Sequence, residues 1–226
     1  MEAFSDGMLA IIITIMVLEM KVPHGTGLDA LRPVMPVFLS YVLSFVYIGI
    51  YWNNHHHMLH TTEHVRGGEL WANLHLLFWL SLIPFATGWL GENWMGEHEA
   101  AGAHTLAWPA AVYGVVLLGA AIAYFVLQGA IIRHQGEGSK LKRAVGRDVK
   151  GKVSPVIYAA AIGLAFVNAW ISVALYVAVA AHVAGAGQAD RAQLLLNSRA
   201  ALLSSSPPAP EILRDVEVHR SRRGGR

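Results

Sequence analysis

The chain contains no cysteine and few charged residues. Its 226 residues are 14% charged and 54% hydrophobic, whereas an ordinary soluble domain is about 25% charged. Without cysteine the chain forms neither a disulfide framework nor a thiolate metal site. Its formal net charge of +2 is too small to indicate a nucleic-acid partner. The apolar residues fall in blocks near the length that crosses a bilayer, which predicts an all-α integral membrane protein.

Apolar runs bounded by charged residues, glycine or proline predict where the chain crosses the membrane. The first four crossings are expected at about residues 4–20, 33–53, 70–90 and 106–132. The third run contains Pro84, where we expect a kink because proline disrupts the helical hydrogen-bond ladder.

The remaining apolar stretch, residues 153–184, does not fit one upright crossing. As a single helix it would be about 48 Å long, against a hydrocarbon core of about 30 Å. Two helices meeting near residues 168–170 would each be short for a crossing. Length alone therefore leaves one steeply tilted helix or two short ones.

Loop charges predict how the chain is oriented. The loop of residues 133–152 carries seven lysines and arginines, whereas the loop of residues 91–104 carries three glutamates and neither lysine nor arginine. By the positive-inside rule the first loop is cytoplasmic and the second lies outside. Counting back places the amino terminus in the cytoplasm, and the arginine-rich tail suits the same side. An even number of crossings follows, and we expect six, in a bacterial-type cell membrane.

Composition divides the chain into two parts. Residues 1–184 carry all the apolar runs and are expected to form a six-helix transmembrane domain. Residues 185–226 are rich in arginine, serine, leucine and proline, which predicts a disordered cytoplasmic tail.

The first predicted helix has two different faces. At about 100° per residue, Ile11, Thr14, Ile15 and Leu18 share one face, while Asp6 projects from nearly the opposite side. An acidic residue in a membrane helix is costly and marks a functional or interhelical site. The apolar stripe is less specific, because such stripes commonly face lipid or a neighbouring helix.

Several motifs follow one another along the chain in a recognisable order. They are Phe4-Ser5-Asp6-Gly7 with Val17-Leu18-Glu19, Tyr51-Trp52-Asn53-Asn54-His55-His56, Trp71-Ala72-Asn73-Leu74, and Leu82-Ile83-Pro84-Phe85-Ala86-Thr87. Over about residues 1–180 this pattern resembles the transmembrane protein 175 family, the lysosomal potassium channel and its prokaryotic relatives.

The resemblance implies a potassium-permeable channel without a Thr-Val-Gly-Tyr-Gly filter, and this sequence contains no such run. It also implies a homotetramer of six-helix subunits whose first helices line a central pore. By position, Ile11, Ile15 and Leu18 match the hydrophobic constriction, and Thr14 matches a threonine layer related to selectivity. With potassium as the permeant ion, we expect no catalytic residue, resident cofactor or metal. The expected partners are the lipid bilayer and further copies of the chain, and no nucleic acid.

The carboxylate of Asp6 needs polar partners on other helices if it is buried. Consistent with the family, we expect an interhelical polar network formed by Phe4, Ser5, Asp6, His55, His56, Asn73 and His75. Which histidines take part is left open by the sequence. The i, i+4, i+8 spacing of His56, His60 and His64 could place imidazoles together for a metal. With neither thiolates nor a His-Glu-Xaa-Xaa-His pattern nearby, we prefer the network.

Two functions of other classes remain as alternatives. Histidines facing one another across helices could ligate a b-type haem, which would make the chain a membrane redox or metal protein. A visible absorbance spectrum separates that hypothesis from a channel. The chain could also be a secondary transporter with a helix broken at Pro84, although it shows no clear inverted repeat.

Overall fold

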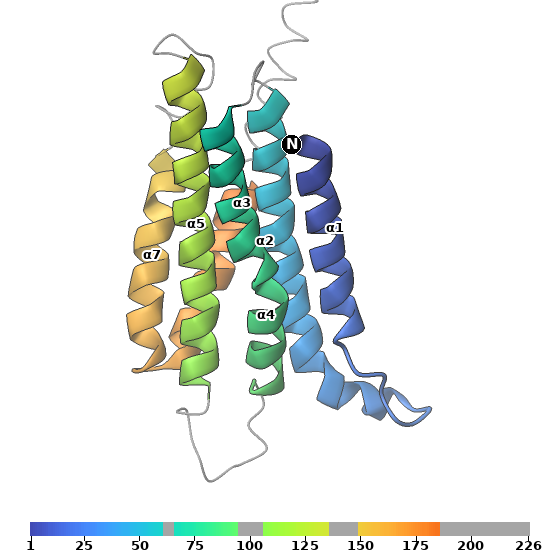
Figure 1. Ribbon diagram of the computed structural model, residues 1–226. Helices are drawn as coiled ribbons and strands as arrows, with labels where there is room; N and C mark the ends of the chain where they lie inside the picture. Colours follow the sequence, from blue (N-terminus) through green and yellow to red (C-terminus); the bar gives the residue numbers. More distant parts are fainter. Residues whose placement is uncertain (61–65, 95–105, 136–148, 186–226) are drawn as a thin grey trace, which may run out of the picture. The chain divides into compact units, whose positions relative to one another are not determined.

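The computed structural model describes residues 1–60, 66–94, 106–135 and 149–185, and these are mostly helical (Figure 1). Residues Met1–Ala184 form one compact unit. Its elements are α1 (Glu2–Leu18), the 3-10 helix η1 (Leu28–Val34), α2 (Met35–His60), α3 (Gly67–Ser81), α4 (Ile83–Glu92), α5 (Ala107–Gln135), α7 (Val149–Ala165) and a last helix, Ala169–Gly185. The predicted tail lies outside the described residues.

Within the part of the chain that the structure describes, three stretches are long and apolar enough to cross a membrane, by length and composition. They are Leu28–Leu59, Gly67–Glu92 and Ala107–Gln135. They correspond to the second, third and fourth predicted crossings. α1, with 17 residues, and the apolar helices Val153–Ala165 and Ala169–Gly185 are all shorter than these three stretches. The structure therefore describes a helical protein with several apolar helices.

The third predicted crossing is two helices with a break at Leu82. Pro84 stands in the first turn of α4, where a missing N–H does no harm, whereas inside a continuous helix its ring would clash with the preceding turn. The Leu82 N–H donates to the Trp79 carbonyl at 3.2 Å. The Thr87 hydroxyl donates to the Ile83 carbonyl at 2.7 Å. Two carbonyls beside the break thus accept hydrogen bonds from the protein's own groups.

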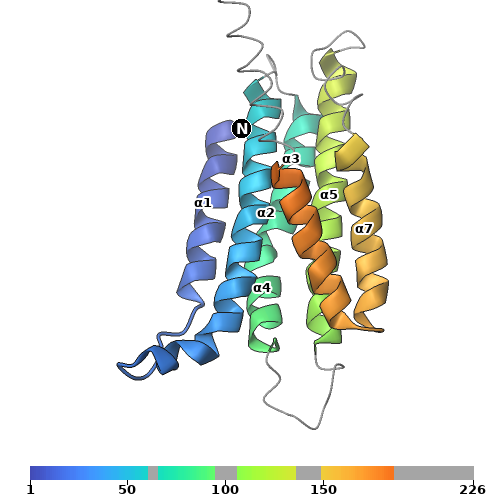
Figure 2. The same cartoon turned by 180° about the vertical axis from the view of Figure 1, so that it is seen from behind.

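Residues 153–184 also divide into two helices. The Asn168 N–H ends the first by donating to the Leu164 carbonyl at 2.8 Å. The Asn168 side chain then starts the second by accepting the Trp170 N–H at 3.0 Å, as residues at helix starts commonly do. The Ser172 hydroxyl donates to the Ala161 carbonyl at 2.6 Å, so the two helices form a hairpin (Figure 2).

Small residues let α5 pack closely at the centre of this unit. α5 contacts α3, α4 and α7. A Cβ atom added at Gly119 would overlap the Trp79 ring of α3. Close backbone approach through glycine is typical of membrane helix interfaces.

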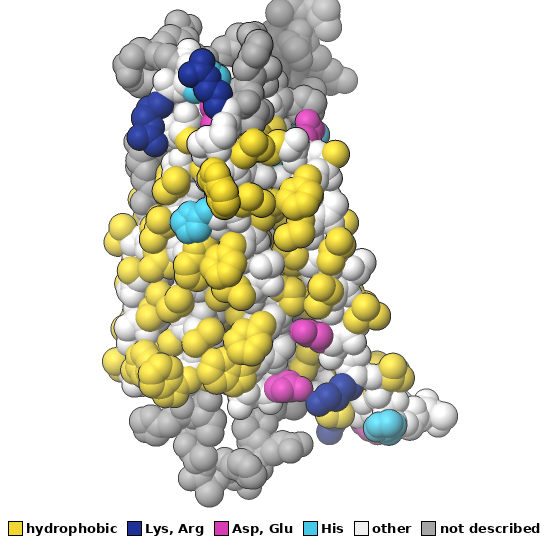
Figure 3. Space-filling view, viewed as in Figure 1, with side chains coloured by type: hydrophobic (Ala, Val, Ile, Leu, Met, Phe, Trp, Pro, Cys, Tyr) yellow, Lys and Arg dark blue, Asp and Glu magenta, His cyan; other side chains and the backbone are white. Residues whose placement is uncertain are grey.

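α1 packs at the edge of the unit, where it contacts α2, α3 and α4 (Figures 1 and 2). Figure 3 shows that hydrophobic side chains cover the middle of one face, whereas lysine, arginine, aspartate and glutamate lie toward its two ends. This distribution suits a bilayer, because charged groups avoid the hydrocarbon core.

Candidate pore-lining helix and its polar anchor

α1 presents one buried face and one exposed face. Its buried side chains, Ser5, Leu9, Ile12 and Met16, pack toward the neighbouring helices. The predicted stripe lies on the opposite side. Ile11 is 55% exposed, Ile15 41% and Leu18 81%, and Thr14 is exposed with them. In the single subunit, therefore, one apolar face of α1 is exposed, and this face contains one hydroxyl group, that of Thr14.

The hydroxyl of Thr14 is held by its own helix. It donates to the Ile11 carbonyl at 2.8 Å, a bond that Ser and Thr commonly make to the preceding turn. The hydrogen is thereby used, and the oxygen keeps lone pairs that accept or coordinate. Thr14 thus places an oxygen ligand, rather than a donor, on the exposed face of α1.

Three buried polar residues join the beginning of α1 to α2 and α3. The Asn73 amide nitrogen donates to the Ser5 hydroxyl oxygen at 3.0 Å. The Asn73 amide oxygen lies 2.7 Å from His55 Nε2. None of the three is more than 2% exposed. The structure therefore brings together three of the predicted network residues, one from each of three helices.

The asparagine also determines which nitrogen of His55 carries the proton. Because the Asn73 oxygen is an acceptor, the opposing His55 Nε2 must be the donor. His55 Nδ1 is then an unprotonated acceptor in the neutral ring, and it is buried with no hydrogen-bond partner among the described residues. This arrangement suits a neutral imidazole whose tautomer is set by Asn73.

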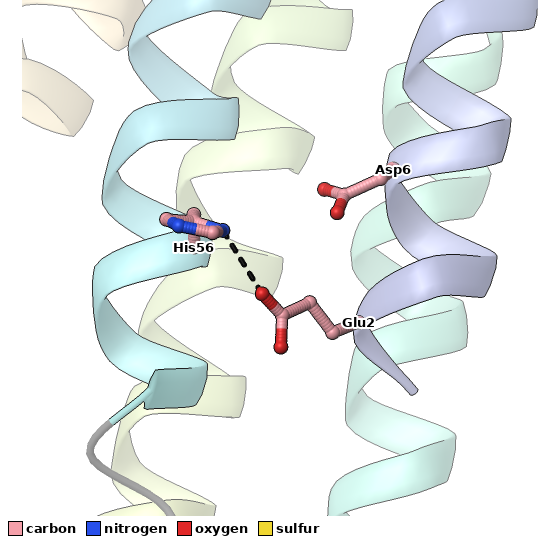
Figure 4. A group of neighbouring side chains, drawn as sticks. All are labelled: Glu2, Asp6 and His56. Carbon is pink, nitrogen blue, oxygen red and sulfur yellow. Dashed lines mark ion pairs between the residues drawn. The ribbon is translucent and has the colours of Figure 1, made fainter.

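Asp6 and His56 face each other across the α1–α2 interface but use other partners. The Trp52 indole N–H donates to Asp6 Oδ1 at 3.0 Å. His56 Nδ1 lies 3.0 Å from Glu2 Oε1 in an ion pair (Figure 4). Asp6 therefore points away from the exposed stripe, as its place on the helix predicts, and accepts a hydrogen bond from a tryptophan.

The other two network candidates lie elsewhere. The Phe4 side chain is 58% exposed. His75 accepts a hydrogen bond from Trp79, one turn further along α3, at 3.0 Å. The contacts described for His75 thus involve its own helix rather than Ser5 or Asn73.

Sequence reasoning did not identify Trp52, Glu2 or the Glu69–His134 pair as part of these contacts. Glu69 is 3% exposed, and its Oε1 lies 3.0 Å from His134 Nδ1 of α5. Glu69 Oε2 also accepts the backbone N–H of Arg66 at 2.9 Å. The i, i+4 spacing of Glu2 and Asp6 was an available signal, because it places both carboxylates on one side of a helix.

Comparison with known proteins identifies the family. A profile described as the endosomal/lysosomal potassium channel TMEM175 matches residues 1–84, which include α1, α2, α3 and the Ser5–Asn73–His55 contacts. A potassium channel of Chryseobacterium sp. is 49% identical over 180 residues, which cover 80% of this chain and 88% of the relative. The chain belongs to the TMEM175 family.

Further TMEM175 similarity covers most of the chain. A potassium channel of Streptomyces collinus is 32% identical over 182 residues, covering 77% of this chain and 85% of the relative. Among solved structures, a lysosomal potassium-selective channel TMEM175 homolog from Chamaesiphon minutus matches with a TM-score of 0.65 at 28% identity. That match covers 81% of this chain and 94% of the other. The helical arrangement is therefore that of a TMEM175 channel.

Proposed function

We propose that this TMEM175-family protein is a potassium-permeable channel, in which four copies surround a central pore lined by α1. The relatives from Chryseobacterium and Streptomyces are named potassium channels, and the Chamaesiphon homologue is described as potassium-selective. Within this chain, the observation that carries the proposal is the uncovered apolar face of α1 with the Thr14 oxygen in it.

In such a tetramer, Ile11, Ile15 and Leu18 form successive apolar rings along the axis. A narrow apolar ring resists wetting, and a cation that has lost its water crosses it poorly, so these rings act as a gate. Four Thr14 hydroxyl oxygens form a ring beside them. Each hydroxyl is already bonded to the Ile11 carbonyl, so its oxygen faces the axis as a ligand for a partly dehydrated potassium ion.

Two interhelical hydrogen bonds at the start of α1, one of them buried, keep this stripe aimed at the axis. Ser5 is tied to Asn73 and Asp6 to Trp52, both on the side of α1 away from the stripe. A rotation of α1 would break both bonds and leave the buried groups of Ser5 and Asn73 unpaired, at a cost of about 1–3 kcal/mol each. The interhelical network therefore serves as an anchor and not as an ion-binding site of the pore.

The proposal includes six crossings with both termini in the cytoplasm. α1, α7 and the helix Ala169–Gly185 then cross as short helices, and a 17-residue helix of about 26 Å comes close to the core thickness of about 30 Å. Residues 1–184 form the channel domain and residues 185–226 a cytoplasmic tail. Potassium is the permeant ion, and the mechanism requires neither a cofactor nor a catalytic residue.

Potassium flux into proteoliposomes tests this function, with sodium measured in parallel. Ile11→Asn adds a polar amide to the first apolar ring, which wets the constriction, and we expect a severalfold higher potassium flux. Val17→Asn is the matched control, because Val17 is also exposed but lies about 100° around the helix from Leu18. Its flux should match that of the unmodified protein.

The same preparations must contain a tetramer of about four times the 24.5 kDa chain mass, which native mass spectrometry measures. Absence of potassium flux from correctly assembled protein would contradict the channel proposal. Equal increases in Ile11→Asn and Val17→Asn would show that the stripe does not line the pore.

A further inference from the structure

Two carboxylates and an imidazole meet where α1 begins and α2 nears its end (Figure 4). Glu2 and Asp6 project from one side of α1, and His56 faces them from α2. One ligand atom from each residue lies within 4.8 Å of the others. Among the described residues, it is the group in which three or more histidine, aspartate or glutamate side chains lie close enough together to hold a metal ion.

We propose that Glu2, Asp6 and His56 bind a divalent transition-metal ion of the zinc class. Zinc is bound by histidine nitrogen and carboxylate oxygen at about 2.0–2.2 Å, which places tetrahedral ligand atoms about 3.3 Å apart. The present 3.0 Å between His56 Nδ1 and Glu2 Oε1 is close to that separation. A small rotation of the side chains completes three ligands, and water supplies the fourth.

Trp52 contacts two of the three residues of the cluster. Its indole N–H donates to Asp6 Oδ1 at 3.0 Å, and its ring stacks on His56 with centroids 5.7 Å apart and an interplanar angle of 27°. Metal sites commonly have such outer contacts, which orient the ligating groups before the ion arrives. One tryptophan thus holds a ligand from each of the two helices.

The cluster is open to water and its donors suit a transition metal. The side chains of His56 and Glu2 are 34% and 39% exposed, which leaves a path for a hydrated ion. Calcium and magnesium prefer six or more oxygen ligands, with magnesium keeping much of its water. An imidazole nitrogen with two carboxylates instead favours zinc and its neighbours. The bound ion would join α1 to α2 beside the Ser5–Asn73–His55 contacts.

Calorimetric titration with Zn²⁺ of the full-length protein in detergent, stripped with chelator, tests the site. We expect one tight site per chain, with Mg²⁺ producing no comparable binding. The conservative variants Glu2→Gln and His56→Gln each remove one ligand, and we expect affinity to fall by about tenfold or more. His57→Gln is the matched control, because His57 is the exposed neighbour of His56 on the same helix.

Thermal unfolding provides a second readout of the same site, through the comparison of variants. Zn²⁺ should raise the unfolding midpoint of the unmodified protein and of His57→Gln, because an ion that binds only the folded state stabilises it. At the same Zn²⁺ concentration it should raise the midpoint of Glu2→Gln distinctly less, because that variant binds the ion more weakly. The changed side chain is more than a third exposed, so the variant should fold normally. Equal Zn²⁺ affinity in all four proteins, or equal binding of Mg²⁺, would overturn the proposal. Neither measurement involves ion flux, so they test the metal site independently of the proposed channel function.

Discussion

At the residue scale, the side-chain amide of Asn73 forms hydrogen bonds to residues of two other helices. Its nitrogen donates to Ser5 of α1, and its oxygen accepts from His55 of α2. The sequence placed all three residues in one predicted network, because a polar residue in an apolar helix needs a partner. It did not separate His55 from His56 or His75, since that depends on how far each helix is rotated against its neighbours.

Asn73→Ala should destabilise the protein strongly. The substitution leaves the Ser5 hydroxyl and His55 Nε2 buried without partners, and each such group costs about 1–3 kcal/mol. A lower thermal unfolding midpoint in detergent should follow. Asn54→Ala, at an exposed position of α2, is the control. If both variants unfold at the same temperature, the Asn73 bonds contribute nothing measurable to stability.

Thr14→Val should reduce selectivity for potassium over sodium severalfold. Valine keeps the shape of threonine but removes the oxygen that Thr14 places on the exposed face of α1. Reversal potentials in bilayers with opposing potassium and sodium gradients measure the ratio. Thr14→Ser keeps the oxygen and should retain the selectivity of the unmodified protein. A valine variant with unchanged selectivity would separate Thr14 from ion discrimination.

At the element scale, the apolar runs located the helices but not all of their ends. α1 runs from Glu2 to Leu18 rather than over residues 4–20, and α2 continues to His60 beyond the predicted end at residue 53. Ends depend on capping and on contacts with neighbouring segments, which hydropathy does not report. The break before Pro84 was predictable, because proline acts through local backbone geometry.

Gly119→Ala should weaken the contact between α5 and α3. A Cβ atom there would overlap the Trp79 ring, and overpacking of this kind costs about 1–3 kcal/mol. The ring cannot move away without disturbing its hydrogen bond to His75. A lower thermal unfolding midpoint measures the effect.

Gly129→Ala supplies the control in the same helix, because an added Cβ at that position meets no atom within 4 Å. Its unfolding midpoint should be unchanged or slightly higher, since alanine favours helix more than glycine does. Equal midpoints for the two alanine variants would indicate that the Trp79 ring adjusts without cost.

At the scale of the whole molecule, contacts between distant segments show which helix ends lie together. Ser5, His55 and Asn73 bring the start of α1, the end of α2 and the start of α3 to one end. The contact between Glu69 of α3 and His134 of α5 places the end of α5 beside these helix ends. At the other end of α1, Lys21 pairs with Glu92 at the end of α4, at 3.1 Å. These contacts therefore show that α1, α2, the pair α3–α4, and α5 alternate in direction.

Single cysteines introduced into this cysteine-free chain test the proposed orientation. His24→Cys, in the exposed segment after α1, should react with a membrane-impermeant maleimide added to intact cells. Ser139→Cys, in the loop rich in lysine and arginine, should react only after the cells are opened. The reverse pattern would contradict cytoplasmic termini, and labelling of both in intact cells would contradict the alternation across the membrane.

The sequence by itself determined that the chain is a helical membrane protein, that one face of its first helix is apolar with Thr14 in it, and that Asp6 points elsewhere. These properties follow from hydropathy and the helical repeat, which are local. Only the tertiary structure decided that Trp52 holds Asp6, that Asn73 joins Ser5 to His55, and that Glu2, Asp6 and His56 meet. Each of these contacts depends on the rotation and height of one helix against another, and such positions are set by packing between segments far apart in the chain.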